Sequence, residues 1–201
     1  MKVDYIFDFA SPNAYLAHKI IPILEESTGS SFEYVPCLLG GIFKLTNNRP
    51  PMIAFAEVKN KNEYMFIEMQ RFMKKYSLNN FKMNSNFPLN TLNLMRGAIA
   101  ANFNDSQREY IDLIFKGVWE KDLKLDEPEV FANYLKENGL DPEFYIENIQ
   151  KQEVKDILMK NTSEAVEHGA FGIPTFKVDD QIFYGKDHMN FLEEYLLQKQ
   201  K

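Results

Sequence analysis

The spacing of apolar residues changes at both ends of the chain, and this change most constrains the fold. Residues 2–9, KVDYIFDF, are aromatic and β-branched, which predicts a strand, and a helical pattern follows from Ser11-Pro12 to about Ser27. A second strand is predicted from Ser31. The helix of this β-α-β unit is long enough to connect two parallel strands.

The other end of the chain has the order β-β-α. Residues 173–178 and 181–184 predict two strands around an Asp-Asp turn, and a last helix is expected from about Asp187. The chain between the two ends is predicted to be almost wholly helical, with helices at 42–46, 61–76, from Phe87-Pro88 to Phe103, at 106–121, 127–138 and 142–148, and one ending near His168.

Strands and helices in this order form the thioredoxin arrangement, an α/β fold, with a large all-helical insertion. We therefore predict a discontinuous thioredoxin-like domain over residues 1–38 and 169–201. The helical insertion domain is predicted over residues 39–168.

The active site of a thioredoxin arrangement lies at the N-terminus of the first helix, where Ser11 stands in this chain. Redox members carry Cys-x-x-Cys there, because the unpaired N–H groups lower a cysteine pKa. This chain has Ser-Pro-Asn-Ala, and Cys37 is its only cysteine, which excludes dithiol exchange at this position and leaves Cys37 as an expected packing residue. Two interpretations of Ser11 stay open: it only caps the helix, or its hydroxyl also stabilises the thiolate of a small thiol.

A second signal lies in Phe-Gly-Ile-Pro-Thr, which places Pro174 at the start of a strand. In the thioredoxin arrangement a cis-proline stands here and faces the helix N-terminus. Its use would be to expose the backbone N–H and C=O of Ile173 to an extended, peptide-like ligand.

Four stretches of the chain match one family in order: FDFASPNAYLA, LLGGIFKLTNN, FPLNTLNLMRGAIAA and FGIPTFKVDDQIFYGKDHM. The chain resembles the 2-hydroxychromene-2-carboxylate isomerase family, close kin of the kappa-class glutathione transferases, over essentially its whole length. The resemblance implies a thioredoxin-like fold with a helical insertion of the DsbA/kappa type, glutathione as cofactor and a homodimer.

The resemblance also implies roles for individual residues. Ser11 matches a serine that hydrogen-bonds the glutathione sulfur, and Ile173 before Pro174 matches the residue whose backbone holds the cysteinyl part. Lys186 and Asp187 match a turn where a carboxylate and backbone N–H groups take the γ-glutamyl end.

Two further matches and two departures concern the rest of the pocket. Asn48 matches a loop asparagine near the substrate, and Lys61 matches a lysine that meets the glycyl carboxylate. Asn47 stands where the family usually has glycine, and His188 where it commonly has arginine, so either departure would alter the substrate pocket.

The activity that the resemblance implies is a glutathione-dependent isomerisation, in which a thiolate adds reversibly to a conjugated, aromatic-derived carboxylate. Glutathione transfer to such an electrophile is the second possibility. The alternative from another class is a thioredoxin-fold module that binds a peptide or partner without catalysis.

Composition and charge limit the remaining function classes. The formal charge is −6 and no Lys/Arg run follows a phosphate backbone, so no nucleic acid is expected. No apolar stretch reaches about 18 residues, and Asp4 and Asp8 interrupt the first apolar run, so neither a membrane span nor a signal peptide is predicted. The single cysteine favours the cytosol. No residue cluster has metal-ligand spacing; Asp8 is expected to accept from nearby amides, and His18 to pack or face solvent.

Overall fold

The structure, a computed structural model, describes residues 1–199 and is built around a four-stranded mixed sheet with the order β2-β1-β3-β4. Strand β1 (Lys2–Phe7) pairs in parallel with β2 (Ser31–Pro36) and antiparallel with β3 (Thr175–Val178). Strand β3 pairs antiparallel with β4 (Gln181–Tyr184). The two ends of the chain thus form one sheet, which confirms the predicted thioredoxin-like α/β fold.

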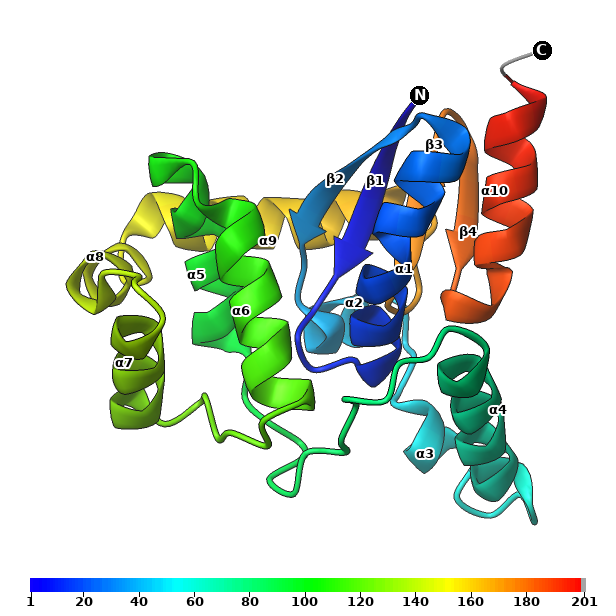
Figure 1. The fold of residues 1–201 in the computed structure, drawn as a ribbon, viewed down its shortest axis with the longest axis horizontal. Helices are drawn as coiled ribbons and strands as arrows, with labels where there is room; N and C mark the ends of the chain where they lie inside the picture. Colours follow the sequence, from blue (N-terminus) through cyan, green and yellow to red (C-terminus); the bar gives the residue numbers. More distant parts are fainter. Residues whose placement is uncertain (200–201) are drawn as a thin grey trace.

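Three long helices pack on this sheet. Helix α1 (Pro12–Thr28) and helix α10 (Met189–Gln198) contact each other on one side, and α9 (Gln152–Glu167) passes behind β2 (Figure 1). Helix α1 begins after the N-cap Ser11 and ends at Gly29, whose φ of 60° is left-handed and therefore suits glycine. The Ser-Pro start and the glycine stop explain both ends of the helix that carries the candidate site.

The other helices lie between β2 and α9 in the sequence, and all of them except α2 fall into two groups in space. Helices α5 to α8 gather beside β2, whereas α3 and α4 lie near the end of the sheet where β1 leads into α1 (Figure 1). The elements are α2 (Leu39–Leu45), α3 (Pro51–Ala54), α4 (Lys61–Lys75), α5 (Leu92–Ala100), α6 (Gln107–Trp119), α7 (Pro128–Glu137) and α8 (Pro142–Asn148), with 3-10 turns η1 (Ala101–Asn104) and η2 (Lys186–His188).

The helical insertion is thus observed in sequence order, while the predicted domain boundaries stay a prediction. Residues 200–201, the end of the predicted thioredoxin-like domain, lie outside the described residues. No helix within residues 1–199 combines the length and apolar character that a bilayer crossing requires.

An aromatic core holds the start of α1 in place. The Tyr5 hydroxyl donates to the carbonyl of Ala14 at 2.6 Å, which fixes the first turn of α1 on β1. Trp119, fully buried at the end of α6, donates through its indole N–H to the carbonyl of Phe9 at 2.9 Å. Both bonds satisfy buried polar groups, so they position the loop between β1 and α1 without an unpaired donor.

The helix predicted from Phe87 starts later, at Leu92. The side-chain oxygen of Asn90 accepts a hydrogen bond from the Leu92 N–H, and such side-chain bonds offer the backbone an alternative to the helix. The predicted C-terminal end of this helix at Phe103 was also wrong, because α5 stops at Ala100 and the chain continues as η1. Phe103, expected on the buried face, is consequently 44% exposed.

Candidate functional site

Ser11 joins the start of α1 to the strand β3. The side chain is 4% exposed, and its Oγ accepts a hydrogen bond from the Ala14 N–H at 3.1 Å, as an N-cap does. The same hydroxyl donates to the carbonyl of Ile173 at 3.2 Å, across 162 residues of sequence. Ser11 therefore does more than cap the helix, since its proton points to the segment that precedes β3.

The Ile173-Pro174 peptide bond is cis, as predicted. The carbonyl of Pro174 accepts from the Gly185 N–H at 2.8 Å, which connects this segment to the turn after β4. Within residues 1–199, the backbone N–H of Ile173 has no hydrogen-bonding partner, although the residue is only 5% exposed. Buried N–H groups are normally paired, so this donor is open to the carbonyl of a ligand.

The turn after β4 brings two opposite charges to the same place. Gly185 has a φ of 86°, which favours glycine, and the turn η2 follows it. The Lys186 Nζ lies 2.5 Å from Oδ1 of Asp187 and 4.9 Å from the centroid of the Phe72 ring. The side chain of Lys186 is 3% exposed and that of Asp187 is 57% exposed, so the ammonium is buried and the carboxylate faces solvent.

Asn48 reaches this group of residues and Lys61 does not. The Nδ2 of Asn48 donates to the carbonyl of Phe171 at 2.9 Å, just before the cis-proline segment. Lys61 is the exposed first residue of α4, and its Nζ lies 5.4 Å from the centroid of the Phe55 ring. No hydrogen bond or ion pair among residues 1–199 links Lys61 to the other predicted site residues. The contacts therefore bring together Ser11, Asn48, Ile173, Pro174, Lys186 and Asp187.

Comparisons with known proteins agree with this fold. Residues 2–197 match the model of the DSBA-like thioredoxin domain family. The chain belongs to this family. This DsbA-like protein is 28% identical over 195 residues to 2-hydroxychromene-2-carboxylate isomerase from Sphingobium xenophagum, with 97% of each chain covered.

Two further relatives of the DsbA-like protein support the same assignment. It is 26% identical over 225 residues to glutathione S-transferase kappa 1 from Caenorhabditis elegans, which covers 99% of this chain and 92% of that protein. A solved structure of 2-hydroxychromene-2-carboxylate isomerase matches the fold with a TM-score of 0.84 at 23% identity, over 98% of this chain and 95% of that chain. The predicted resemblance is confirmed, and isomerase and transferase relatives support an enzyme.

Asp8 of the DsbA-like protein connects the loop before Ser11 to two other segments of the chain. Its Oδ1 accepts from the Ala10 N–H at 2.9 Å and from the Thr91 hydroxyl at 2.6 Å, and its Oδ2 accepts from the Leu39 N–H at 2.8 Å. Burial raises the pKa of Asp8, and these three hydrogen bonds oppose the rise. The predicted amide contacts are confirmed, whereas Thr91 was missed because no local pattern links positions so far apart.

Cys37 is fully buried, which confirms its predicted packing role. Burial raises the pKa of its thiol strongly and the nearby Asp8 adds to the rise, so the thiolate is disfavoured. In the part of the chain that the structure describes, no group of three or more His, Cys, Asp or Glu side chains is arranged for a metal ion.

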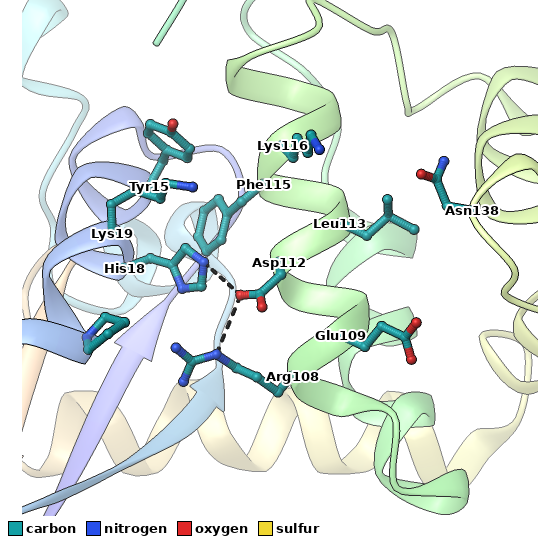
Figure 2. Close-up of a pocket in the computed structure, with 11 residues that line it drawn as sticks. Tyr15, His18, Lys19, Arg108, Glu109, Asp112, Leu113, Phe115, Lys116 and Asn138 are labelled. Carbon is teal, nitrogen blue, oxygen red and sulfur yellow. Dashed lines mark ion pairs between the residues drawn. The ribbon is translucent and has the colours of Figure 1, made fainter. Parts of the chain in front are cut away.

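A separate cavity of about 500 Å³ lies between α1 and α6 (Figure 2). His18, which packs on the Phe115 ring, contacts the Tyr34 hydroxyl through Nδ1 at 2.7 Å and Oδ1 of Asp112 through Nε2 at 2.9 Å. Arg108 lies 3.4 Å from the same carboxylate oxygen. None of the predicted site residues lines this cavity, so it is distinct from the Ser11 site.

His18 is expected to make the fold less stable in mild acid. Burial lowers the pKa of the His18 imidazole, and the neighbouring Asp112 carboxylate opposes that shift. As the pH falls, the unfolded chain therefore protonates His18 before the folded protein does. The contribution of neutral His18 to stability is fully present above the pKa of about 6.5 that a histidine has in the unfolded chain. It is lost as the pH falls toward the lower pKa of His18 in the folded protein. Urea unfolding between about pH 7.5 and pH 5.5 measures this loss.

The matched variant for this measurement is His18→Gln. Glutamine keeps polar contact but does not titrate, while Asp8 titrates in both proteins, so the difference between the two pH profiles isolates His18. We expect a shallower pH dependence in the variant, and parallel profiles would contradict the assignment.

Proposed function

We propose that this chain is a glutathione-dependent isomerase that acts on a conjugated, aromatic-derived carboxylate, as the name of its 2-hydroxychromene-2-carboxylate isomerase relatives suggests. The observation that carries the proposal is the hydrogen bond from the Ser11 hydroxyl to the Ile173 carbonyl, beside the unpaired Ile173 N–H. These groups bring one hydroxyl donor, one free amide and the start of α1 to a single point.

The residues at this point fit a thiol-bearing peptide such as glutathione. The free Ile173 N–H would hold a backbone carbonyl of an extended peptide. The exposed carboxylate of Asp187 suits the ammonium of the γ-glutamyl end. The Ser11 hydroxyl and the N–H groups at the start of α1 favour a negatively charged sulfur.

Glutathione held by Ser11 and the start of α1 would supply a thiolate nucleophile for reversible addition to an electrophilic carbon of the substrate. In the free protein the single Ser11 proton is bonded to the Ile173 carbonyl. Rotation of the hydroxyl toward a sulfur would exchange this neutral hydrogen bond for a charge-assisted one, which is stronger. Together with the dipole of α1, Ser11 would therefore lower the pKa of a bound thiol and raise its fraction of thiolate.

Kappa-type glutathione transfer is the second candidate, because kappa transferases are also among the relatives. It would use the same residues, and the product would keep the glutathione. A non-catalytic binding module would use the same surface without turnover. The homodimer and the role of Lys61, which the resemblance implies, stay predictions, as does the cytosolic location that the single cysteine favours.

Thermal unfolding with millimolar glutathione tests the proposal. A ligand that binds only the native state must raise the midpoint of thermal unfolding. At a ligand concentration about 100 times the Kd, the free energy of unfolding rises by about 2.7 kcal/mol. The thiol-free analogue γ-glutamyl-alanyl-glycine should give a smaller shift, because it lacks the sulfur that Ser11 meets. An unchanged midpoint with glutathione would contradict the proposal.

Product analysis then separates the two activities. Incubation with 2-hydroxychromene-2-carboxylate and glutathione should yield a product of unchanged mass if the protein is an isomerase. A product that carries the mass of glutathione would indicate a transferase instead.

A further inference from the structure

Strand β2 lies at an edge of the sheet, and its outer side carries backbone groups that no strand within residues 1–199 pairs with. On the inner side, the Ser31 N–H donates to the Met1 carbonyl at 2.9 Å and the Cys37 N–H donates to the Phe7 carbonyl at 3.0 Å. Alternate residues of a paired strand bond to the same neighbour. The odd-numbered residues of β2 therefore face β1, and the even-numbered residues point their backbone groups away from it.

Both ends of this outer edge are closed. The Phe32 N–H donates to Oε1 of Glu25 at 3.2 Å. Pro36 has no N–H, and its carbonyl accepts from Nδ2 of Asn161 at 3.1 Å. Between these two points, the Phe32 carbonyl and both backbone groups of Tyr34 have no hydrogen-bonding partner in the part of the chain that the structure describes. The open part is therefore short, with one N–H and two carbonyl groups for an extended chain to pair with.

A cavity of about 300 Å³ lies along the open part of this edge. Glu33 and Tyr34 both line it, and because successive side chains of a strand point to opposite faces, the cavity lies at the edge of β2 rather than on one face. Gln107 and Arg108, at the start of α6, line the cavity from the other side. We call this site, formed by Phe32, Glu33, Tyr34, Gln107 and Arg108, the edge slot.

Arg108 brings a positive charge to the edge slot. Its guanidinium carbon lies 4.6 Å from the centroid of the Tyr34 ring, and its Nε lies 3.4 Å from Oδ1 of Asp112 (Figure 2). The two terminal nitrogens of Arg108 donate to no acceptor within residues 1–199, so most of its five N–H donors are available. A guanidinium that rests on an aromatic ring and presents two free terminal nitrogens suits a carboxylate.

We propose that the edge slot binds a short, extended peptide segment of a partner protein that carries an acidic side chain. The main chain of the segment pairs with the free backbone groups of Tyr34 as an added strand. Its carboxylate binds the terminal nitrogens of Arg108. The closed ends at Phe32 and Pro36 limit the pairing to a few residues, which also protects the edge from continuous pairing with another sheet.

The edge slot is separate from the proposed glutathione site. Phe32 lies opposite Val3, near the start of β1, whereas Thr175, next to the cis-proline, lies opposite Ile6 near the end of β1. The two sites are thus at opposite ends of the sheet, and a ligand in one leaves the other open.

The probe for the edge slot is the capped peptide acetyl-Thr-Val-Asp-Val-Thr-amide, whose β-branched residues favour an extended chain. Amide hydrogen exchange measured by NMR should show slower exchange of the Tyr34 N–H when the peptide binds. At about 90% saturation the rate should fall about tenfold, because only the unbound protein exposes this N–H. The Ser31 N–H, which is already bonded to the Met1 carbonyl, should not change.

Two analogues of the peptide separate the main-chain contact from the charge contact. N-methylation of the three central residues removes the N–H groups that reach the carbonyls of the edge, and should weaken binding by about tenfold or more. Replacing the aspartate of the peptide with asparagine should weaken binding about three- to fivefold, because the Arg108 side chain is 42% exposed and water screens its charge.

The test variant is Arg108→Gln, with Lys116→Gln as its matched control. Lys116 lies on the same helix and has no hydrogen bond or ion pair within residues 1–199, but it lies outside the edge slot. Arg108→Gln should bind the aspartate peptide about three- to fivefold more weakly and should no longer distinguish it from the asparagine peptide. Lys116→Gln should bind both peptides as the unmodified protein does. Both residues are exposed, so the variants should fold, and thermal unfolding checks this.

Four results would overturn the proposal. The first is unchanged exchange of the Tyr34 N–H at millimolar peptide, and the second is an equal loss of affinity in the two variants, which would indicate general charge attraction. The third is displacement of the peptide by glutathione, which would place it at the Ser11 site. The fourth is protection of the Tyr34 N–H that rises with protein concentration without peptide, because a second copy of the chain would then fill the edge slot.

Discussion

Replacing Ser11 with alanine is expected to lower turnover with glutathione and 2-hydroxychromene-2-carboxylate by one to two orders of magnitude. A hydrogen bond to a charged group is worth about 1.5–3 kcal/mol, and about 1.4 kcal/mol corresponds to a tenfold change in rate. The variant should remain folded, because removal of an N-cap costs only about 1 kcal/mol. Steady-state rates together with thermal unfolding give both results.

Two matched variants separate the effect of the Ser11 hydroxyl on turnover from the effect of losing a helix N-cap on stability. Ser11→Thr keeps a hydroxyl at the same place and should retain more of the activity. Asp141 caps α8 by accepting from the Glu143 N–H at 3.0 Å, so Asp141→Ala removes a similar cap in the helical insertion. It should lower stability with turnover unchanged. Unmodified turnover in Ser11→Ala would refute the role given to this hydroxyl.

The largest effect on stability is expected for Gly97→Ala. Gly97 lies within α5, where a Cβ would stand 2.1 Å from the Tyr110 hydroxyl oxygen and 2.6 Å from the adjoining ring carbon. Tyr110 is fully buried, stacks on Tyr145 and donates to the carbonyl of Leu94 at 3.1 Å, so it cannot move freely. Overpacking of this kind costs about 2–3 kcal/mol, which corresponds to roughly 4–12 °C in the unfolding midpoint.

Gly40→Ala is the matched control for this effect. Gly40 is also helical, but a Cβ there meets nothing within 4 Å. Alanine should therefore be neutral or slightly stabilising at Gly40, because it favours a helix over glycine by about 1 kcal/mol. The double variant Gly97→Ala with Tyr110→Phe should recover part of the loss, since it removes the closest atom. Equal midpoints for the two single alanine variants would show that α5 and α6 are not packed as described.

The local signals of the sequence predicted most of the fold correctly. The Ser-Pro start of α1, the glycine after it and the alternating strands at both ends depend on neighbouring residues, so they can be recognised without tertiary contacts. The prediction was wrong where side chains replace local hydrogen bonds. Asn90 delays the start of α5, and the early end of α5 turns Phe103 toward solvent.

The candidate site was predicted only as a set of positions. Ser11, Ile173 and Asp187 were chosen from the thioredoxin arrangement and from a family resemblance, and the structure places them within one set of contacts. Nothing in the sequence indicates that Phe72 covers the Lys186 ammonium, because the two residues belong to distant segments. The same holds for the Asp8–Thr91 bond and for the His18–Asp112 contact.

The sequence by itself determined the order of strands and helices, the absence of a Cys-x-x-Cys motif at the start of α1 and the presence of a hydroxyl in its place. Only the tertiary structure decided where the Ser11 proton points, which backbone amide stays unpaired and how deeply the Lys186 ammonium is buried. The reason is physical: secondary structure follows from interactions within a few residues, whereas burial and hydrogen-bond pairing depend on segments that meet only after folding.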